Sequence, residues 1–190
     1  RDLLPLTVTF SEELKKYDYF IHLHSKKSGH TRGKADWSTQ LFHHLLHSRA
    51  HTTRLLNHLH DHPKVGLAFP VYHSSVAKQI RWGGNFAKAQ TLAEGLGQKL
   101  SLTDLKPFPA GSFFVAKTSA VEQLLHLGLT HEDFDGEYGQ VDGTLCGSSR
   151  YASYNSSTYA AFAPAMWDES HHAFITRCCI VVPWLNKTYN

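Results

Sequence analysis

Short apolar runs with the composition of β-strands alternate along this chain with stretches of helical periodicity. Aromatic and β-branched residues mark strands at Tyr19–His24, Val65–Pro70 and Phe113–Lys117. Apolar side chains at helical spacing mark helices over about Trp37–Ser48, Ala50–His62 and Phe86–Leu96, and from Thr118 or Ser119 to Gly128. Strands that alternate with helices are typical of a sheet whose strands run parallel. We therefore predict an α/β fold in which helices flank a mostly parallel sheet.

The chain beyond Gly128 is less regular. Val141 onward has a helical pattern to about Tyr154, and Ile180–Val182 has the composition of a late edge strand. A length of 190 residues with 42% hydrophobic residues allows one ordinary core. We expect a single domain over residues 1–190, with its core at 1–155 and a C-terminal extension at 156–190.

The charge and the cysteines limit the classes of partner and compartment. The net charge is only +3, and the basic residues do not form the broad face with interleaved aromatics that nucleic-acid binders show, so we expect no nucleic-acid partner. Three cysteines without C-x-x-C spacing indicate a reducing compartment. The longest apolar run, Ile175–Leu185, is too short and too interrupted to span a membrane, and no secretory signal is visible.

A basic segment follows the first predicted strand. His24, Ser25, Lys26 and Lys27 lie at the strand's carboxyl end, which is where open α/β sheets bind ligands. Lysine ammonium groups and a neighbouring hydroxyl can hold a diphosphate and stabilise the charge that develops on a departing nucleoside diphosphate. The alternative is a solvated basic loop, since pairs of lysines are often simple surface residues.

An acidic, glycine-rich segment at Gly136–Thr144 is the second candidate. Glu137 and Asp142 flank a turn that opens a predicted helix, where the helix dipole stabilises a carboxylate that can still accept a proton from a sugar hydroxyl. Asp142 is our candidate base. The alternative is that Asp142 only caps the helix and Glu137 is exposed.

Small residues and tryptophans form a third group of candidates. Phe108–Phe114 contains Gly111 and Ser112, whose small size lets backbone approach a ligand, although glycine here also fits a bulge. The rings of Trp37 and Trp82 suit stacking on a sugar, but tryptophan is at least as common in a core.

Fifteen histidines raise the question of a metal site. His43 and His47 are four residues apart on one predicted helix, and His58, His60 and His62 alternate near the end of the next. No H-E-x-x-H pattern accompanies them, and no cysteine or carboxylate completes a ligand set at familiar spacing. We therefore favour exposed or locally hydrogen-bonded histidines over a zinc site.

Taken in order, several segments resemble the rhamnan synthesis protein F family, which is associated with transferring rhamnose and related sugars onto bacterial cell-surface polysaccharides. The resemblance covers about residues 1–145, and the Glu137–Leu145 block is its most specific part, followed by the lysine block. The segments that carry it are Arg1–Pro5, Tyr17–Tyr19, His22–Ser28, Gly66–Leu67, Gly84–Asn85, Phe108–Ser112 and Glu137–Leu145.

This resemblance implies a GT-A-like, Rossmann-like glycosyltransferase fold. Arg1–Asp2 resembles the Arg-Asn segment that precedes the central strand of GT-A enzymes, so the strands that form their base-and-ribose pocket are expected to be missing. We accordingly expect a fragment of a larger enzyme, or a processed or divergent form. Where GT-A enzymes carry Asp-x-Asp for a metal-bound nucleotide, this chain has His24-Ser25-Lys26.

The resemblance also implies the roles of individual residues in an inverting sugar transfer. Asp142 acts as the base and Glu137 orients the acceptor. The diphosphate of the nucleotide sugar is expected at His24, Ser25, Lys26, Lys27 and Asp2. Substrate contacts are expected at Trp82, Gly84, Asn85, Gly111, Ser112 and Gln140. Because lysine neutralises phosphate directly, no cofactor is required, while His22 and His24 leave a divalent metal open.

The expected partners follow from the same resemblance. The acceptor is a polysaccharide or a lipid-linked glycan, and the place of action is the cytoplasm, with peripheral association at the inner face of the cytoplasmic membrane. The main alternative is a non-catalytic module with a glycosyltransferase-like fold that binds glycans or a partner. A weaker one is a metal-dependent hydrolase built on the histidines.

Overall fold

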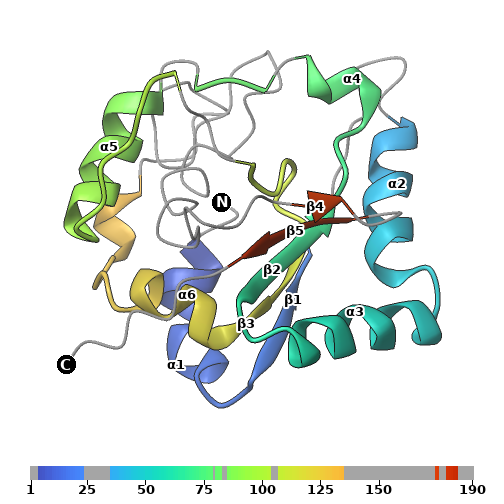
Figure 1. Ribbon diagram of the computed structural model, residues 1–190. Coiled ribbons are helices and arrows are strands. Elements are labelled where there is room, and N and C mark those ends of the chain that lie inside the picture. The colour runs from blue at the N-terminus through green and yellow to red at the C-terminus, as the bar shows by residue number, and fades with distance from the viewer. Residues whose placement is uncertain are drawn as a thin grey trace.

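The computed structural model describes residues 4–23, 35–78, 80–82, 85–103, 107–134, 174–175 and 179–183 (Figure 1). Its helices are α1 (Ser11–Leu14), α2 (Ala35–Leu46), α3 (Arg49–Asp61), α4 (Ser74–Ala77), α5 (Phe86–Gly95) and α6 (Thr118–Leu125). A π-helical turn at Pro5–Thr9 and a 3₁₀ turn at His131–Asp133 complete the helical elements. The strands are β1 (Tyr19–His22), β2 (Val65–Pro70), β3 (Phe114–Lys117), β4 (Phe174–Ile175) and β5 (Cys179–Pro183).

The strands form one five-stranded sheet in the order β1-β3-β2-β5-β4. Each neighbouring pair is antiparallel, with Tyr19 opposite Lys117, Leu67 opposite Ala116 and Ala68 opposite Val181 among the paired residues. The mixed α/β class is confirmed, but the prediction of a mostly parallel, GT-A-like sheet is wrong.

The insertion of β3 explains the error. Strands β1 and β2 both run antiparallel to β3, so they run parallel to each other, as expected for two strands joined through helices α2 and α3. They are not neighbours, however, because β3 lies between them and runs the opposite way. The alternation of strands and helices correctly indicates the direction of β1 and β2, but it cannot reveal which strand comes between them.

Helices α2 and α3 are consecutive and meet at a corner beside the sheet, on the right in Figure 1, whereas α1, α5 and α6 lie on its left. Ser48 caps α3 by accepting a hydrogen bond from the backbone N–H of His51 at 3.2 Å, and Pro63 follows shortly after the end of α3. The buried face of α2 is formed by Trp37, Leu41 and Leu45, each 1% exposed. They join β2, which is buried along its whole length, in a single hydrophobic core.

The C-terminal strand is present but does not lie at the edge. β5 pairs with β2 on one side and with β4 on the other, so β4 is the edge strand. The helix expected over Val141–Tyr154 lies outside the described residues.

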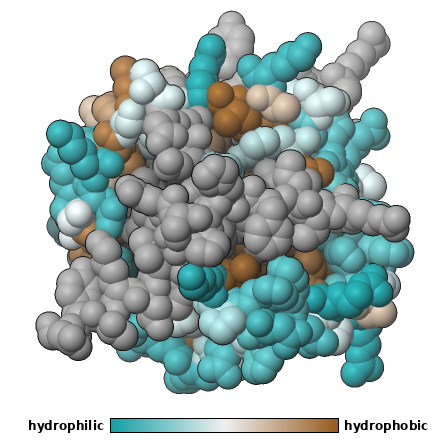
Figure 2. Space-filling model, in the orientation of Figure 1, coloured by the Kyte–Doolittle hydropathy of each residue, from teal (hydrophilic) through white to brown (hydrophobic). Residues whose placement is uncertain are grey.

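The surface shown in Figure 2 is mainly hydrophilic where it is described, with small separate groups of hydrophobic side chains. The large exposed hydrophobic residues among those described are Phe42 and Leu46, four residues apart on α2, and Phe10, Tyr17 and Leu102, which lie outside the helices and strands. Among the described residues, no helix combines the length and the apolar composition needed to cross a membrane.

Candidate active site

Three segments meet at one edge of the sheet, which we call the β1–β2 carboxyl edge. It comprises His22 at the end of β1, Val71–His73 directly after β2, and Phe108–Phe113 leading into β3. The register brings them together, because His22 pairs with Phe114 and Ala68 pairs with Val115. Strand ends of this kind position loop residues on a rigid support.

His22 connects two of these segments. Its Nδ1 lies 2.6 Å from the backbone carbonyl oxygen of Ser112, and its ring stacks on Phe114 with 5.1 Å between ring centroids. A carbonyl oxygen only accepts, so Nδ1 carries the hydrogen and donates it. In the neutral imidazole this leaves Nε2 as the acceptor. The hydrogen bond and the stacking together fix the last side chain of β1, the strand that precedes residues 24–34 in the sequence.

The backbone at Gly111 and Ser112 is left-handed. Their φ angles are +82° and +59°, and Ser112 is the non-glycine residue with positive φ among those described. A Cβ on Gly111 would lie 2.9 Å from Cζ2 of Trp37 and 3.1 Å from Cδ1 of Leu41. Gly111 thus lets this turn pack directly against the indole ring of α2, and the turn carries Ser112 to His22.

Tyr72 fixes the beginning of the same turn. Its hydroxyl accepts a hydrogen bond from the N–H of Phe108 at 3.0 Å and donates one to the carbonyl oxygen of Phe108 at 3.1 Å. Burial raises the pKa of Tyr72 to about 12, although the bond to the Phe108 carbonyl acts in the opposite direction. From α2, Gln40 donates to the carbonyl oxygen of Val71 at 3.1 Å. The segments after β2 and before β3 are therefore held by side chains at several points.

All of the residues predicted from the sequence to act in catalysis or donor binding lie outside the described residues, namely Asp2, His24, Ser25, Lys26, Lys27, Glu137 and Asp142. Two of the predicted substrate contacts, Gly84 and Gln140, also lie outside them. Gly111 and Ser112 lie at the β1–β2 carboxyl edge, at the strand end that leads into the lysine segment. The described geometry therefore places one of the three sequence candidates, the Gly111–Ser112 turn, against the last residue of β1.

Trp82 and Asn85 belong to the start of α5. Trp82 is 6% exposed, its indole N–H donates to the carbonyl oxygen of Ser101 at 3.3 Å, and its ring meets Phe86 edge-on. Asn85 is the N-cap residue of α5 and is 2% exposed. Trp37, the other candidate platform, is also a core residue. The stacking role of Trp82 and the substrate contact of Asn85 stay predictions.

Sequence reasoning did not assign Tyr72 to the site, and it considered His22 only as a metal ligand. Both residues lie at or just beyond the carboxyl end of a predicted strand, where His24–Ser28 was also found. Applying the same rule to both strands would have identified Tyr72. The bonds to Ser112 and Phe108 carry no local signal, because the partners are 90 and 36 residues away.

The described histidines form ring contacts and backbone hydrogen bonds. His43 stacks on His47 and His58 stacks on His62, with centroids 4.6 Å and 4.1 Å apart. His51 lies 2.6 Å from the carbonyl oxygen of His44 through its Nε2. Over the described ranges, no group of three or more histidine, cysteine, aspartate or glutamate side chains could hold a metal ion.

Comparisons with known proteins place the chain among polysaccharide-synthesis proteins. The family model described as rhamnan synthesis protein F matches residues 1–154. The uncharacterized protein WxcX of Xanthomonas campestris pv. campestris strain B100 is 31% identical over 146 residues, which is 76% of this chain and 21% of the relative. Its counterpart in a second strain of this pathovar is 30% identical over the same length. The chain therefore spans about a fifth of these relatives. No solved structure matches.

Proposed function

Because the chain belongs to the rhamnan synthesis protein F family, we propose that it transfers rhamnose or a related sugar from a nucleotide-sugar donor to a growing cell-surface polysaccharide. Family membership connects the chain with rhamnan and polysaccharide synthesis, and the transfer reaction is our proposal. One observation supports it most: His22 ties the origin of the lysine segment to the Gly111–Ser112 turn. A basic segment that follows β1 in the sequence, and a small-residue turn held against the end of β1, suit a diphosphate sugar.

The donor half of the proposal rests on Lys26 and Lys27. Two ammonium groups so close in the sequence can neutralise the charge that builds up on a departing nucleoside diphosphate. His24, Ser25 and Asp2 would complete the donor contacts. Lysine supplies this charge directly, so the step requires no divalent metal.

The acceptor half rests on the acidic segment at Gly136–Thr144. Asp142 takes the proton of the acceptor hydroxyl while the oxygen of that hydroxyl bonds to the anomeric carbon of the donor sugar. The bond from this carbon to the diphosphate oxygen breaks at the same time. Glu137 orients the acceptor, and Gln140, Gly84 and Asn85 contribute contacts. One displacement inverts the configuration at the anomeric carbon, and no covalent enzyme intermediate forms. The acceptor is a polysaccharide or a lipid-linked glycan, at the inner face of the cytoplasmic membrane.

Calorimetric titration with dTDP-rhamnose, with and without Mn²⁺, tests the donor half. We expect binding without Mn²⁺ and a loss of at least about tenfold in affinity for Lys26→Ala/Lys27→Ala, since hydrogen bonds to charged groups contribute about 1.5–3 kcal/mol. Lys15→Ala/Lys16→Ala is the matched control, because it removes another adjacent lysine pair that lies at the opposite end of β1. Equal affinities in both double variants would contradict the lysine site.

A further inference from the structure

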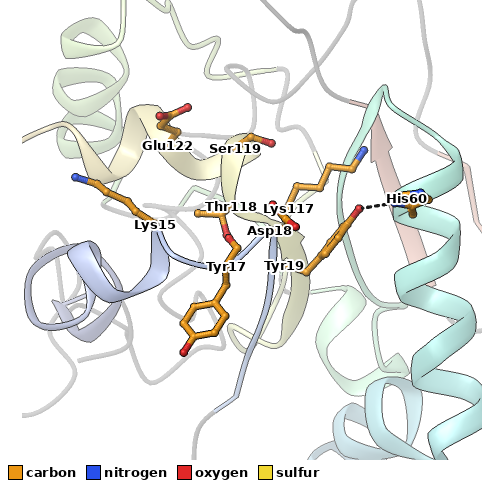
Figure 3. Close-up of a pocket in the computed structure, with 9 residues that line it drawn as sticks. All are labelled: Lys15, Tyr17, Asp18, Tyr19, His60, Lys117, Thr118, Ser119 and Glu122. Carbon is orange, nitrogen blue, oxygen red and sulfur yellow. Dashed lines mark hydrogen bonds between the residues drawn. The ribbon is translucent and has the colours of Figure 1, made fainter.

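A cavity lies at the other end of β1, away from the β1–β2 carboxyl edge (Figure 3). It has a volume of about 460 Å³ and is lined by Lys15, Tyr17, Asp18, Tyr19, His60, Lys117, Thr118, Ser119 and Glu122. Tyr19 is the first residue of β1 and His22 is the last. At a rise of about 3.3 Å per residue, the two ends of this strand are about 10 Å apart. The cavity is therefore separate from the β1–β2 carboxyl edge.

The floor of this cavity is held by hydrogen bonds between distant segments. The hydroxyl of Thr118 donates to the carbonyl oxygen of Tyr17 at 2.5 Å, and the N–H of Thr118 donates to the carbonyl oxygen of Asp18 at 2.9 Å. These bonds fix the α1–β1 connection against the start of α6. Because these hydrogen bonds hold the backbone of both lining segments in place, the cavity is preformed, as small-molecule sites usually are.

Hydrogen-bond donors of the cavity come from opposite sides. Lys117 donates to the carbonyl oxygens of His62 and Pro63 at 3.0 and 3.2 Å, which uses two of the three hydrogens of its ammonium group. Lys15 is paired with Glu12 at 2.6 Å, which likewise leaves hydrogens for a ligand. On the right of Figure 3, the hydroxyl of Tyr19 lies 3.2 Å from Nδ1 of His60, which orients both rings.

Acceptors face the same space. Figure 3 shows Ser119 and Glu122 on α6 and Asp18 in the connection before β1. The side chains of Asp18, Ser119 and Glu122 make no hydrogen bond to another described residue. Two carboxylates and two lysines give the lining a balanced charge, which disfavours a phosphate or another small anion. Tyr17, 57% exposed, and Tyr19 add aromatic surface.

We propose that this cavity binds a saccharide unit of a glycan, at the end of β1 opposite the β1–β2 carboxyl edge. Each sugar hydroxyl both donates and accepts, which matches a lining of ammonium, carboxylate and hydroxyl groups. Aromatic rings with a polar end pack against the apolar face of a sugar. The volume lies in the range of about 300–1,000 Å³ that is typical of small-molecule pockets. The proposal rests on this lining and does not depend on the transfer reaction.

The probe is a short rhamnan oligosaccharide, with binding followed by saturation-transfer NMR and calorimetry. We expect saturation from the tyrosine rings to reach the sugar, and Asp18→Asn/Glu122→Gln to weaken binding by about tenfold through the loss of two charged acceptors. Glu132→Gln is the control, since it removes an exposed carboxylate outside the cavity. Both altered cavity side chains are exposed, so circular dichroism should be unchanged.

Two outcomes would overturn the proposal. One is a failure to support cavity binding, either because wild type binds no oligosaccharide or because Asp18→Asn/Glu122→Gln binds it as strongly as Glu132→Gln does. The other is displacement of the sugar by inorganic phosphate in a manner that depends on Lys15 and Lys117, which would identify an anion site. Lys26→Ala/Lys27→Ala separates this test from the transfer proposal, because it should weaken dTDP-rhamnose binding by at least about tenfold and leave the oligosaccharide affinity unchanged.

Discussion

Nδ1 of His22 donates a hydrogen bond to the backbone carbonyl oxygen of Ser112 across 2.6 Å, although the two residues are 90 positions apart in the sequence. This bond joins the end of β1 to the turn that leads into β3. It holds the end of β1, which precedes the lysine segment in the sequence, against the turn at Gly111 and Ser112.

Replacing His22 with alanine should lower the free energy of unfolding by about 1–2 kcal/mol, because the bond to Ser112 and the stacking on Phe114 are both lost. Urea denaturation followed by circular dichroism measures this change. His131→Ala is the control, since His131 is exposed on a 3₁₀ turn, and it should be nearly neutral. Equal effects of the two substitutions would show that His22 does not support the edge.

Replacing Gly111 with alanine should destabilise the protein by more than about 2 kcal/mol. The added Cβ would be strained by the left-handed backbone and would also lie 2.9 Å from the ring of Trp37. Gly97→Ala separates the two effects, because Gly97 also has positive φ but has nothing within 4 Å of an added Cβ. We expect it to cost only about 1 kcal/mol. A smaller loss for Gly111→Ala than for Gly97→Ala would contradict the close packing of the turn.

Replacing Tyr72 with phenylalanine should cost about 1–3 kcal/mol, because the buried N–H and carbonyl oxygen of Phe108 both lose a partner. The substitution also changes how the free energy of unfolding depends on pH in the alkaline range. The pKa of Tyr72 is raised by burial to about 12 in the folded state, above its ordinary value of 10. Its contribution to stability is therefore complete below pH 10 and is lost as the pH rises from 10 through about 12. The difference between wild type and Tyr72→Phe should shrink over that interval, and a constant difference would count against the buried hydroxyl.

The histidines of α2 and α3 should make the protein less stable in mild acid. Burial lowers the pKa of His44, assisted by His43 and His51, and burial lowers the pKa of His58, assisted by His62 and opposed by Asp61. A lowered folded-state pKa means that the unfolded chain binds protons first, so this stability is present above about pH 6.5 and falls as the pH drops below it.

The double variant His44→Gln/His58→Gln should show a flatter dependence of unfolding free energy on pH below 6.5 than wild type does. His126→Gln/His131→Gln is a control with two exposed histidines that do not contribute to the lowered pKa of His44 or His58. If it flattened the profile as much as the first variant does, the account of burial at His44 and His58 would be wrong.

The sequence predicts the elements of this fold well where their patterns are local. Val65–Pro70 has the predicted bounds, and β1, β3 and the four longer helices lie within a few residues of theirs. Periodicity and the turn residues at Pro63 and Gly128 carry that information. The short helices α1 and α4 were not predicted, since each has only four residues and no usable period.

Strand order and side-chain connections could not be predicted in the same way. Whether β3 lies beside β1 and β2 or between them depends on long-range packing, which leaves no trace in the spacing of residues. The burial of Trp82 and the role of Tyr72 likewise depend on partners far along the chain, Ser101 and Phe108. The lysine and acidic segments are marked by residue chemistry rather than by packing, and their roles stay predictions.

The most direct test of the account is a product assay with dTDP-rhamnose and a rhamnan acceptor, comparing the intact protein with its Asp142→Asn variant. We predict transfer with inversion at the anomeric carbon, and a loss of at least about a hundredfold in the variant, since general bases contribute about 10²–10⁴ in rate. Circular dichroism and donor affinity should be unchanged. Normal turnover by Asp142→Asn, or donor binding without any transfer by the intact protein, would contradict the proposed glycosyltransferase.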